Sequence, residues 1–205
     1  MMTVDELVQL IHRLGNSVIK DEENLTQLDA AIGDGDHGLN MAKGFKAVQE
    51  KLKQEQFSKP SEVLKTVGMT LVSTVGGASG PLYGTAFMQM AMSVKDKDSL
   101  SIDDLSILLN AAKEGIEKRG HATNGEKTML DMLVPYINTL ESVGTNNMTQ
   151  LKKDLISTMK KAKQNIIEMK ATKGRASYLG ERSVDHMDPG AQSMMDMLTA
   201  VTEVL

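Results

Sequence analysis

Apolar residues recur at helical spacing along almost the whole chain, and this periodicity limits the fold more than any other feature. Seven apolar residues near the start fall close to one stripe of period 3.6, which predicts an amphipathic helix: Val4, Leu7, Val8, Ile11, Leu14, Val18 and Ile19. Thr3 and Glu6 have the spacing of a capping box at its start. No alternating apolar and polar run bounded by turn residues is found, so no sheet is predicted.

The same spacing predicts further helices over 39–52, 61–73, 82–94, 102–119, 128–143, 148–170 and 190–204. Pro60 and Pro81 suit helix starts, and Ser101 can cap the helix that follows it. Roughly eight helices of similar length, joined by short glycine-rich loops, predict an all-α fold. We expect an antiparallel up-and-down bundle or barrel. The length of 205 residues fits a single domain over residues 1–205.

Composition excludes several classes of protein. The chain has no Cys, which rules out disulfides and thiolate metal sites and favours a cytoplasmic location. The acidic N-terminus does not resemble a signal peptide, and no apolar run approaches the roughly 18 residues of a membrane helix. The net charge of −4 gives no indication of nucleic-acid binding.

Three carboxylates gather within eight residues at Asp29, Asp34 and Asp36, and Gly33 and Gly35 lie between them. Glycines let the backbone fold back so that such side chains can converge. Converging carboxylates repel one another, and a hard cation such as Mg²⁺, Mn²⁺ or Ca²⁺ is their natural counter-charge. An acidic turn between two helices, with no metal, is the alternative.

Two better-known motifs do not explain this loop. An EF-hand that starts at Asp34 would place Phe45 at position 12, where a bidentate Glu is needed. The run from Gly33 to Gly38 fits the formal dinucleotide fingerprint, but no predicted strand precedes it, and its bare carboxylates would face a pyrophosphate. Carboxylates approach phosphates through a bridging metal, so the loop favours a metal-bound nucleotide.

Other loops carry groups that suit an anion. His37 begins a predicted helix whose free N–H groups favour a phosphate, and Ser79 lies in a run of small residues before another helix. The segment 174–190 is long for a helix connection, which indicates a binding loop, and it contains Arg175 and Arg182. A Walker A motif is absent, which excludes a P-loop kinase.

Four ordered motifs resemble the L subunits of bacterial dihydroxyacetone kinases, and the likeness covers essentially the whole chain. They are the run from Asp29 to Gly38, Gly77-Ala-Ser-Gly-Pro-Leu-Tyr-Gly, Lys127-Thr-Met-Leu-Asp, and Gly174-Arg-Ala-Ser-Tyr-Leu-Gly-Glu-Arg-Ser with Asp188-Pro-Gly-Ala. Two positions depart from the family pattern: Glu126 replaces the usual Asp, and Asp185 stands where Gly is frequent.

The resemblance implies an eight-helix barrel that holds ADP or ATP with two Mg²⁺ in the loops at one end. By this likeness Asp29, Asp34 and Asp36 are metal ligands and act in catalysis through the metal. The resemblance also implies phosphate contacts from His37, Gly38, Leu39, Asn40, Ala78 and Ser79. The rest of the nucleotide pocket is implied to be Gly120, Thr128, Met129, Arg175, Asp188, Pro189 and Gly190, with Met129 near the adenine.

The length of the chain bears on its expected partners. Dihydroxyacetone kinases that use ATP directly carry K and L domains in one longer chain, whereas this length matches the L part alone. The resemblance therefore implies bound ADP that a phosphotransferase-system M subunit rephosphorylates, and a K subunit that holds dihydroxyacetone. Two alternatives stay open: a nucleotide-dependent interaction with a transcriptional regulator, through the Lys-rich face of 152–173, or a kinase subunit that acts on another acceptor.

Overall fold

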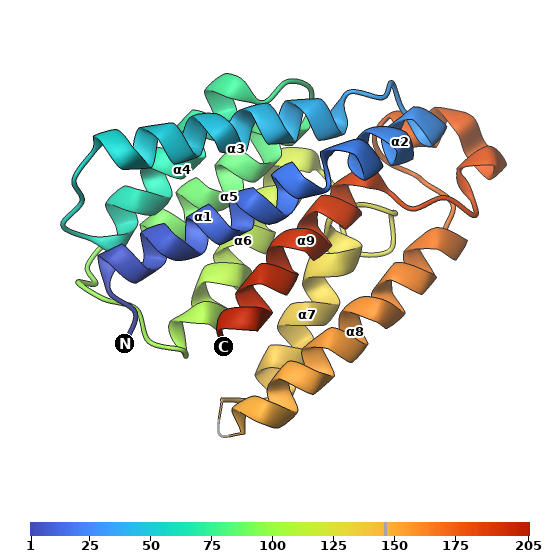
Figure 1. The fold of residues 1–205 in the computed structure, drawn as a ribbon. Helices are drawn as coiled ribbons and strands as arrows, with labels where there is room; N and C mark the ends of the chain where they lie inside the picture. Colours follow the sequence, from blue (N-terminus) through green and yellow to red (C-terminus); the bar gives the residue numbers. More distant parts are fainter. Residues whose placement is uncertain (146) are drawn as a thin grey trace.

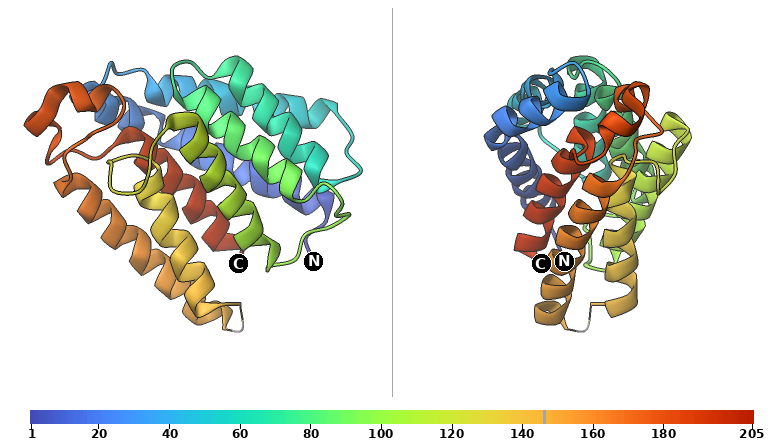
Figure 2. Two further views of the ribbon diagram at one scale, coloured as in Figure 1. Left: turned by 180° about the vertical axis from the view of Figure 1, so that it is seen from behind. Right: turned by 90° about the vertical axis from the view of Figure 1, so that its right-hand side faces the viewer.

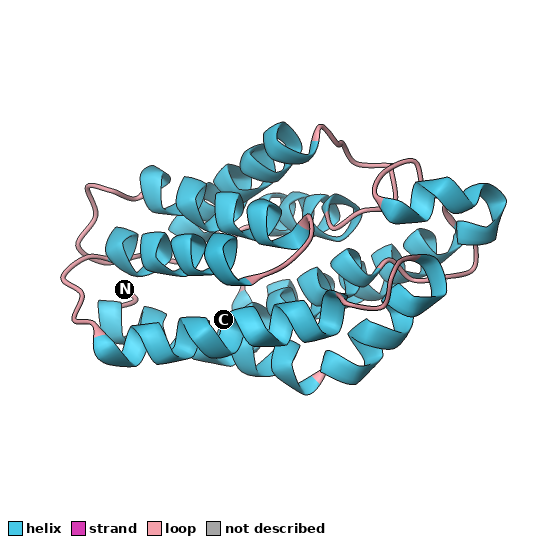
Figure 3. Cartoon of the chain, turned by 90° about the horizontal axis from the view of Figure 1, so that it is seen from above, coloured by secondary structure: helices cyan, strands magenta, loops and turns pink. Residues whose placement is uncertain are grey.

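The computed structural model describes residues 1–145 and 147–205, which form nine α-helices and one 3₁₀ helix (Figure 1). The α-helices are α1 (Val4–Lys20), α2 (Glu22–Ile32), α3 (His37–Gln54), α4 (Pro60–Thr74), α5 (Ser79–Ser93), α6 (Asp104–Gly120), α7 (Leu130–Val143), α8 (Met148–Glu168) and α9 (Pro189–Val204). The 3₁₀ helix η1 spans Arg175–Ser183. The described chain is helix and loop (Figure 3), apart from an isolated antiparallel bridge between Met2 and Leu100. This confirms the predicted all-α class.

Eight of the helices pack side by side in a closed series of contacts. From α3 onward each helix packs on the next, α9 returns to α1, and α1 also packs on α3 (Figures 1 and 2). The ninth, α2, continues beyond α1 and packs on α3 and α9. Because these helices alternate in direction, α3, α5, α7 and α9 all begin at the end of the molecule where α2 and η1 lie (Figure 1).

Most of the core is one large cluster of buried apolar side chains inside this series of helices, and Ile32, Ala171 and Ala176 form a small second cluster. The largest fully buried side chains include Tyr83, Tyr136, Phe45 and Met41. Glycine brings α4 and α5 unusually close, because a Cβ on Gly68 would lie 2.8 Å from the Gly84 carbonyl oxygen. Within the described residues, none of the helices combines the length and the apolar character needed to cross a membrane.

The helix boundaries confirm most of the predictions and correct some of them. The capping box of Thr3 and Glu6 is formed, and Ser101 makes reciprocal hydrogen bonds with Asp104 at the start of α6. The apolar pattern does not predict α2 as a helix of its own. Its buried positions are Leu25, Asp29 and Ile32, so a carboxylate interrupts the apolar stripe on which the prediction depended. Asp29 therefore lies in the last turn of a helix and not in a loop.

Three further differences concern the segments that approach the candidate site. Helix α5 begins at Ser79, two residues before Pro81, so Ser79 belongs to its first turn. The predicted binding loop 174–190 contains η1, which the apolar pattern did not reveal. Helix α7 begins at Leu130, slightly later than predicted, because Thr128 and Asp131 form the turn that starts it.

Candidate functional site

A cavity of about 510 Å³ opens at the end of the molecule where these helices begin. Residues at the starts of α3, α5, α7 and α9 form much of its wall, together with the end of α2 and the segment around η1. The first N–H groups of a helix have no partner within the helix, and the helix dipole makes this end partly positive. Four helix starts around one cavity therefore favour an anionic ligand.

The structure brings the predicted site residues together. The cavity is lined by Asp29, Asp34, Asp36, His37, Asn40, Ala78, Ser79, Gly120, Thr128, Met129, Arg175, Asp188, Pro189 and Gly190. Gly38 and Leu39 are not part of the lining. Gly38 is buried against α2, where a Cβ would clash with the Glu22 carbonyl oxygen, and the Leu39 side chain is exposed. These two residues can face a ligand only through their backbone N–H groups.

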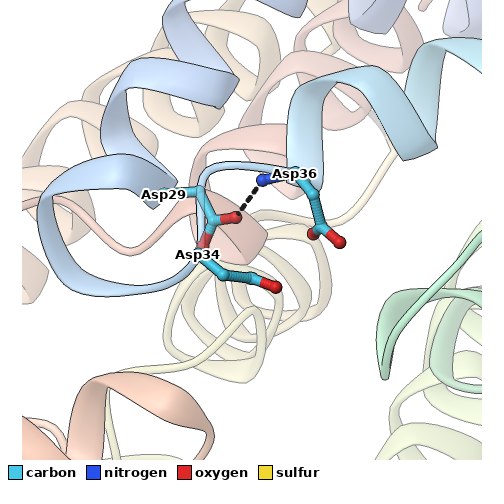
Figure 4. Close-up of side chains that lie close together, drawn as sticks. All are labelled: Asp29, Asp34 and Asp36. Carbon is cyan, nitrogen blue, oxygen red and sulfur yellow. Dashed lines mark hydrogen bonds between the residues drawn. The ribbon is translucent and has the colours of Figure 1, made fainter.

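The three carboxylates converge as predicted (Figure 4). One oxygen from each of Asp29, Asp34 and Asp36 lies within 4.8 Å of the others. Asp29 is buried, and its Oδ2 accepts hydrogen bonds from the backbone N–H groups of Asp36 (2.8 Å) and His37 (3.0 Å). Asp34 forms an ion pair with the guanidinium of Arg175. This all-oxygen set fits a hard divalent cation, which would supply the remaining counter-charge.

The imidazole of His37 is buried and engaged on both sides. Its Nδ1 lies 3.0 Å from Ser79 Oγ, and its Nε2 lies 2.9 Å from Ser193 Oγ. Burial lowers the pKa of His37 to about 4, although the nearby Asp29 and Asp36 act in the opposite direction. The ring is therefore neutral at physiological pH. Ser193 was not predicted as a site residue, because a Ser inside an apolar helix pattern carries no signal of its own.

One wall of the cavity is apolar. Met129, Leu82, Ile116 and Ala122 line it next to Gly120. A Cβ on Gly120 would lie 3.1 Å from the Leu82 side chain, so the glycine keeps this wall open. A flat aromatic ring suits such a surface, and the thioether of Met129 makes favourable contacts with ring edges.

Lys127 anchors the segment that carries η1, a role that the sequence pattern does not indicate. The side chain is 1% exposed, and its Nζ donates to the carbonyl oxygens of Ile167 (3.1 Å), Met169 (2.7 Å) and Ser183 (2.7 Å). Burial lowers the pKa of Lys127, while Asp188 and Asp185 raise it. The ammonium thus fixes both ends of the segment that presents Arg175 to the cavity.

Asp188 begins the last helix at the cavity wall. Its Oδ2 accepts the N–H of Ala191 at 2.8 Å, which caps α9. Removal from water raises the pKa of Asp188 to about 7, and the Ala191 hydrogen bond and the charge of Lys127 lower it only in part.

Neither departure from the family pattern lines the cavity. The Glu126 carboxylate accepts the N–H of Thr123 at 2.7 Å, so it closes the turn before Lys127. Asp185 has φ +64°, the left-handed conformation in which Gly is favoured.

Fold and site together define an all-helical protein whose cavity suits a metal-bound phosphate group beside a flat ring. The chain belongs to the DAK2 domain family, whose model matches residues 31–203. It is 44% identical over 194 residues to the ADP-binding subunit DhaL of a PEP-dependent dihydroxyacetone kinase of Listeria innocua, covering 94% of this chain and 93% of the relative. The corresponding PTS-dependent subunit of Lactococcus lactis is 41% identical over 205 residues, which is the full length of both chains. The DhaL subunit of Escherichia coli is 43% identical over 195 residues, with 94% and 93% covered.

Solved structures share the fold. The native dihydroxyacetone kinase of C. freundii superposes with a TM-score of 0.73 at 22% identity, covering 100% of this chain and 36% of that chain. The same enzyme in complex with AMP-PNP and Mg²⁺ gives a TM-score of 0.71 at 22% identity, covering 97% and 34%. This chain thus spans about a third of the length of those kinases.

Proposed function

We propose that this chain is the ADP-binding L subunit of a phosphoenolpyruvate-dependent dihydroxyacetone kinase, a phosphotransferase that acts on an alcohol group. The observation that carries the proposal is the meeting of three carboxylates with four helix starts at one cavity. Carboxylates repel a neighbouring anionic ligand unless a cation lies between the carboxylates and the ligand. The relatives named as DhaL subunits match this chain over nearly their whole length.

The nucleotide would lie across the cavity with its phosphates at the acidic end. Asp29, Asp34 and Asp36 would hold two Mg²⁺ ions, which would bridge the phosphates and offset charge that develops during transfer. The N–H groups of Gly38 and Leu39, the Asn40 side chain and the Ala78–Ser79 turn would contact the phosphates. The N–H groups of His37 and Asn40 already donate to Asp29 Oδ2 and to the Asp36 carbonyl oxygen. Arg175 is placed to exchange its partner from Asp34 to a phosphate oxygen.

The base would occupy the apolar wall. Gly120, Thr128 and Met129 would contact the adenine and ribose from one side. The turn of Asp188, Pro189 and Gly190 would complete the pocket from α9. The chain's own residues thus bind and orient the nucleotide, and no side chain of this protein needs to become phosphorylated.

The reaction requires two partners. An M subunit would donate a phosphoryl group to the β-phosphate of bound ADP, and the ATP formed would pass its γ-phosphoryl group to a hydroxyl of dihydroxyacetone held by a K subunit. ADP would stay bound between turnovers as a carrier. Such a system works in the cytoplasm, where phosphoenolpyruvate is available.

The Lys-rich face of α8 is the surface expected to meet a transcriptional regulator. Part of it is engaged within the molecule, because Lys163 donates to Gln192 and Lys152 to the Glu203 carbonyl oxygen. Lys160 and Lys161 are exposed. Phosphotransfer thus has the stronger support, and regulator binding is a second role to be tested at Lys160 and Lys161.

Native mass spectrometry of the purified protein tests the carrier role. We expect a mass increase that corresponds to ADP and two Mg²⁺, lost in Asp36→Ala. Purified K and M subunits should then support transfer from phosphoenolpyruvate to dihydroxyacetone without added nucleotide. An empty protein that needs stoichiometric ATP for each turnover would contradict the carrier role. An Asp36→Ala variant that keeps ADP and Mg²⁺ like the wild type would contradict the metal site.

A further inference from the structure

A chain of hydrogen-bonded side chains leads from the cavity into the core. It starts at Ser79 in the cavity wall, passes through His37 and Ser193, and ends at Tyr83. The Tyr83 hydroxyl lies 2.8 Å from Ser193 Oγ and 3.0 Å from the Gly190 carbonyl oxygen, and it can donate its single proton to either. Ser193 is fully buried and Tyr83 is 1% exposed. The chain therefore joins α3, α5 and α9 at the point where all three reach the cavity.

The donors and acceptors of this chain allow two arrangements of protons. In the first, Tyr83 donates to Ser193, Ser193 donates to Nε2 of His37, and Nδ1–H donates to Ser79. In the second, Ser193 donates to the Gly190 carbonyl at 3.1 Å, Nε2–H donates to Ser193, and Ser79 donates to Nδ1. A hydroxyl has a single proton to donate. Ser79 can therefore donate into the cavity only in the first arrangement.

We propose that Ser193 and Tyr83 are positioning residues that hold His37 in the Nδ1–H form, so that Ser79 donates its proton to a phosphate oxygen of the bound nucleotide. This inference rests on the proposed function, because it takes the ligand of the cavity to be a nucleotide. An anion in the cavity favours the first arrangement, in which Ser79 donates its proton to the anion. In the second arrangement Ser79 would present a lone pair to the anion, which is repulsive. His37 thereby acts through Ser79 and not by direct contact with the phosphate.

The geometry supports this indirect role for His37. Both ring nitrogens already have partners within 3.0 Å, so a direct bond to phosphate would break one of these bonds. Such a bond would replace a contact that the ring already makes, with Ser79 or with the buried Ser193, and would not add one. The Tyr83 hydroxyl holds Ser193, and with it the first turn of α9, which lines the cavity.

Matched variants separate positioning from simple loss of a buried hydrogen bond. Ser193→Ala and Tyr83→Phe break the series of hydrogen bonds between Tyr83 and Ser79. Tyr136→Phe is the control, because Tyr136 makes the same kind of buried bond to Thr202 on the same helix α9, at 2.9 Å and away from the cavity. All three should lower the unfolding midpoint by similar amounts. Titration calorimetry with ADP and Mg²⁺ should show about tenfold weaker binding for Ser193→Ala, equal to about 1.4 kcal/mol, and no comparable loss for the control.

A double-mutant cycle tests whether Ser193 acts through Ser79. In a Ser79→Ala background, Ser193→Ala should weaken ADP binding by less than twofold, because the two effects share one path. Full additivity of the two losses would overturn the proposal. Equal ADP affinities for Ser193→Ala and Tyr136→Phe would overturn it as well, while leaving the proposed function intact as long as the wild type binds ADP with Mg²⁺.

The tautomer itself can be observed directly in the wild type. With imidazole ¹⁵N labelling, the NMR spectrum of the protein contains signals from four His. Comparison with the His37→Gln variant identifies the signal of His37. The wild type with ADP and Mg²⁺ should show Nδ1 protonated. A ring protonated only at Nε2 would refute the relay, and a wild type that fails to bind ADP with Mg²⁺ would refute both the relay and the proposed function.

Discussion

Asp29 has two roles, one in the carboxylate cluster and one at the start of α3, and only the first is shared with Asp34 and Asp36. Besides facing Asp34 and Asp36, it accepts two backbone N–H groups at the start of α3. Hydrogen bonds to charged groups contribute about 1.5–3 kcal/mol each. Asp29→Ala removes both, but it also relieves repulsion within the carboxylate cluster. We therefore expect a net loss of about 2–3 kcal/mol of stability. Asp34→Ala loses only an exposed ion pair with Arg175, which is worth about 0–1 kcal/mol.

Urea unfolding in EDTA without nucleotide measures this difference. With an m-value of about 2 kcal/mol/M, the Asp29→Ala midpoint should fall by about 1–1.5 M, while Asp34→Ala should stay within about 0.5 M of the wild type. Both variants should lose Mg²⁺-dependent ADP binding in calorimetry. Equal midpoints for the two variants would refute the capping role of Asp29. Retained tight binding in either would refute its role as a metal ligand.

Three further substitutions test other parts of the structure. Lys127→Met removes the ammonium that donates to three carbonyl oxygens, of which Ile167 alone keeps the Asp185 N–H as a second donor. Residues 169–188 should therefore exchange amide hydrogens faster, with a stability loss of about 1–3 kcal/mol for each of the other two carbonyl groups. Burial, and then the charge of Asp21, raise the pKa of Asp196 to about 7, above an unfolded value of about 3.9. Stability should therefore fall as pH rises from about 4 to about 7. Asp196→Asn should remove the part of this fall that Asp196 contributes and stabilise the protein at pH 8 by roughly 2–4 kcal/mol in denaturant titrations. The rest of the fall belongs to Asp188, whose pKa burial also raises to about 7. Gly38→Ala should lower the melting temperature despite the better helix propensity of Ala, because its Cβ would clash with the Glu22 carbonyl oxygen. The expected loss of stability is about 1–3 kcal/mol. An unchanged melting temperature would show that α2 can move away.

The sequence predicted the long amphipathic helices because burial of an apolar stripe determines them. It did not reveal α2, where Asp29 occupies a buried position that an apolar residue would normally fill. It also did not reveal η1, whose buried residues are only Ala176 and Ser183. In both cases a polar or small residue is buried for a reason that lies elsewhere in the chain, which no local pattern reports.

In the site, too, local motifs indicate some residues, whereas residues defined by distant contacts go undetected. The residues that a motif marks, such as Asp34, Asp36 and Ser79, line the cavity as expected. Ser193 and Tyr83 could not be found in this way, because their roles depend on contacts across 156 and 110 residues of sequence. Lys127 belonged to a recognised motif, but its three carbonyl partners lie 40 to 56 residues away. These partners become evident only when the helices are packed.

The hydrogen bond between His37 and Ser193 also has a consequence for folding. Since it joins the third helix to the last, the cavity cannot exist in a partly folded chain that has assembled only its first helices. Contacts so distant in sequence form late, after the local helices. A ligand that binds only the completed cavity stabilises the native state by mass action and leaves intermediates unaffected. Ligand occupancy therefore reports that the chain has finished folding, and an unoccupied subunit is the form most exposed to proteolysis.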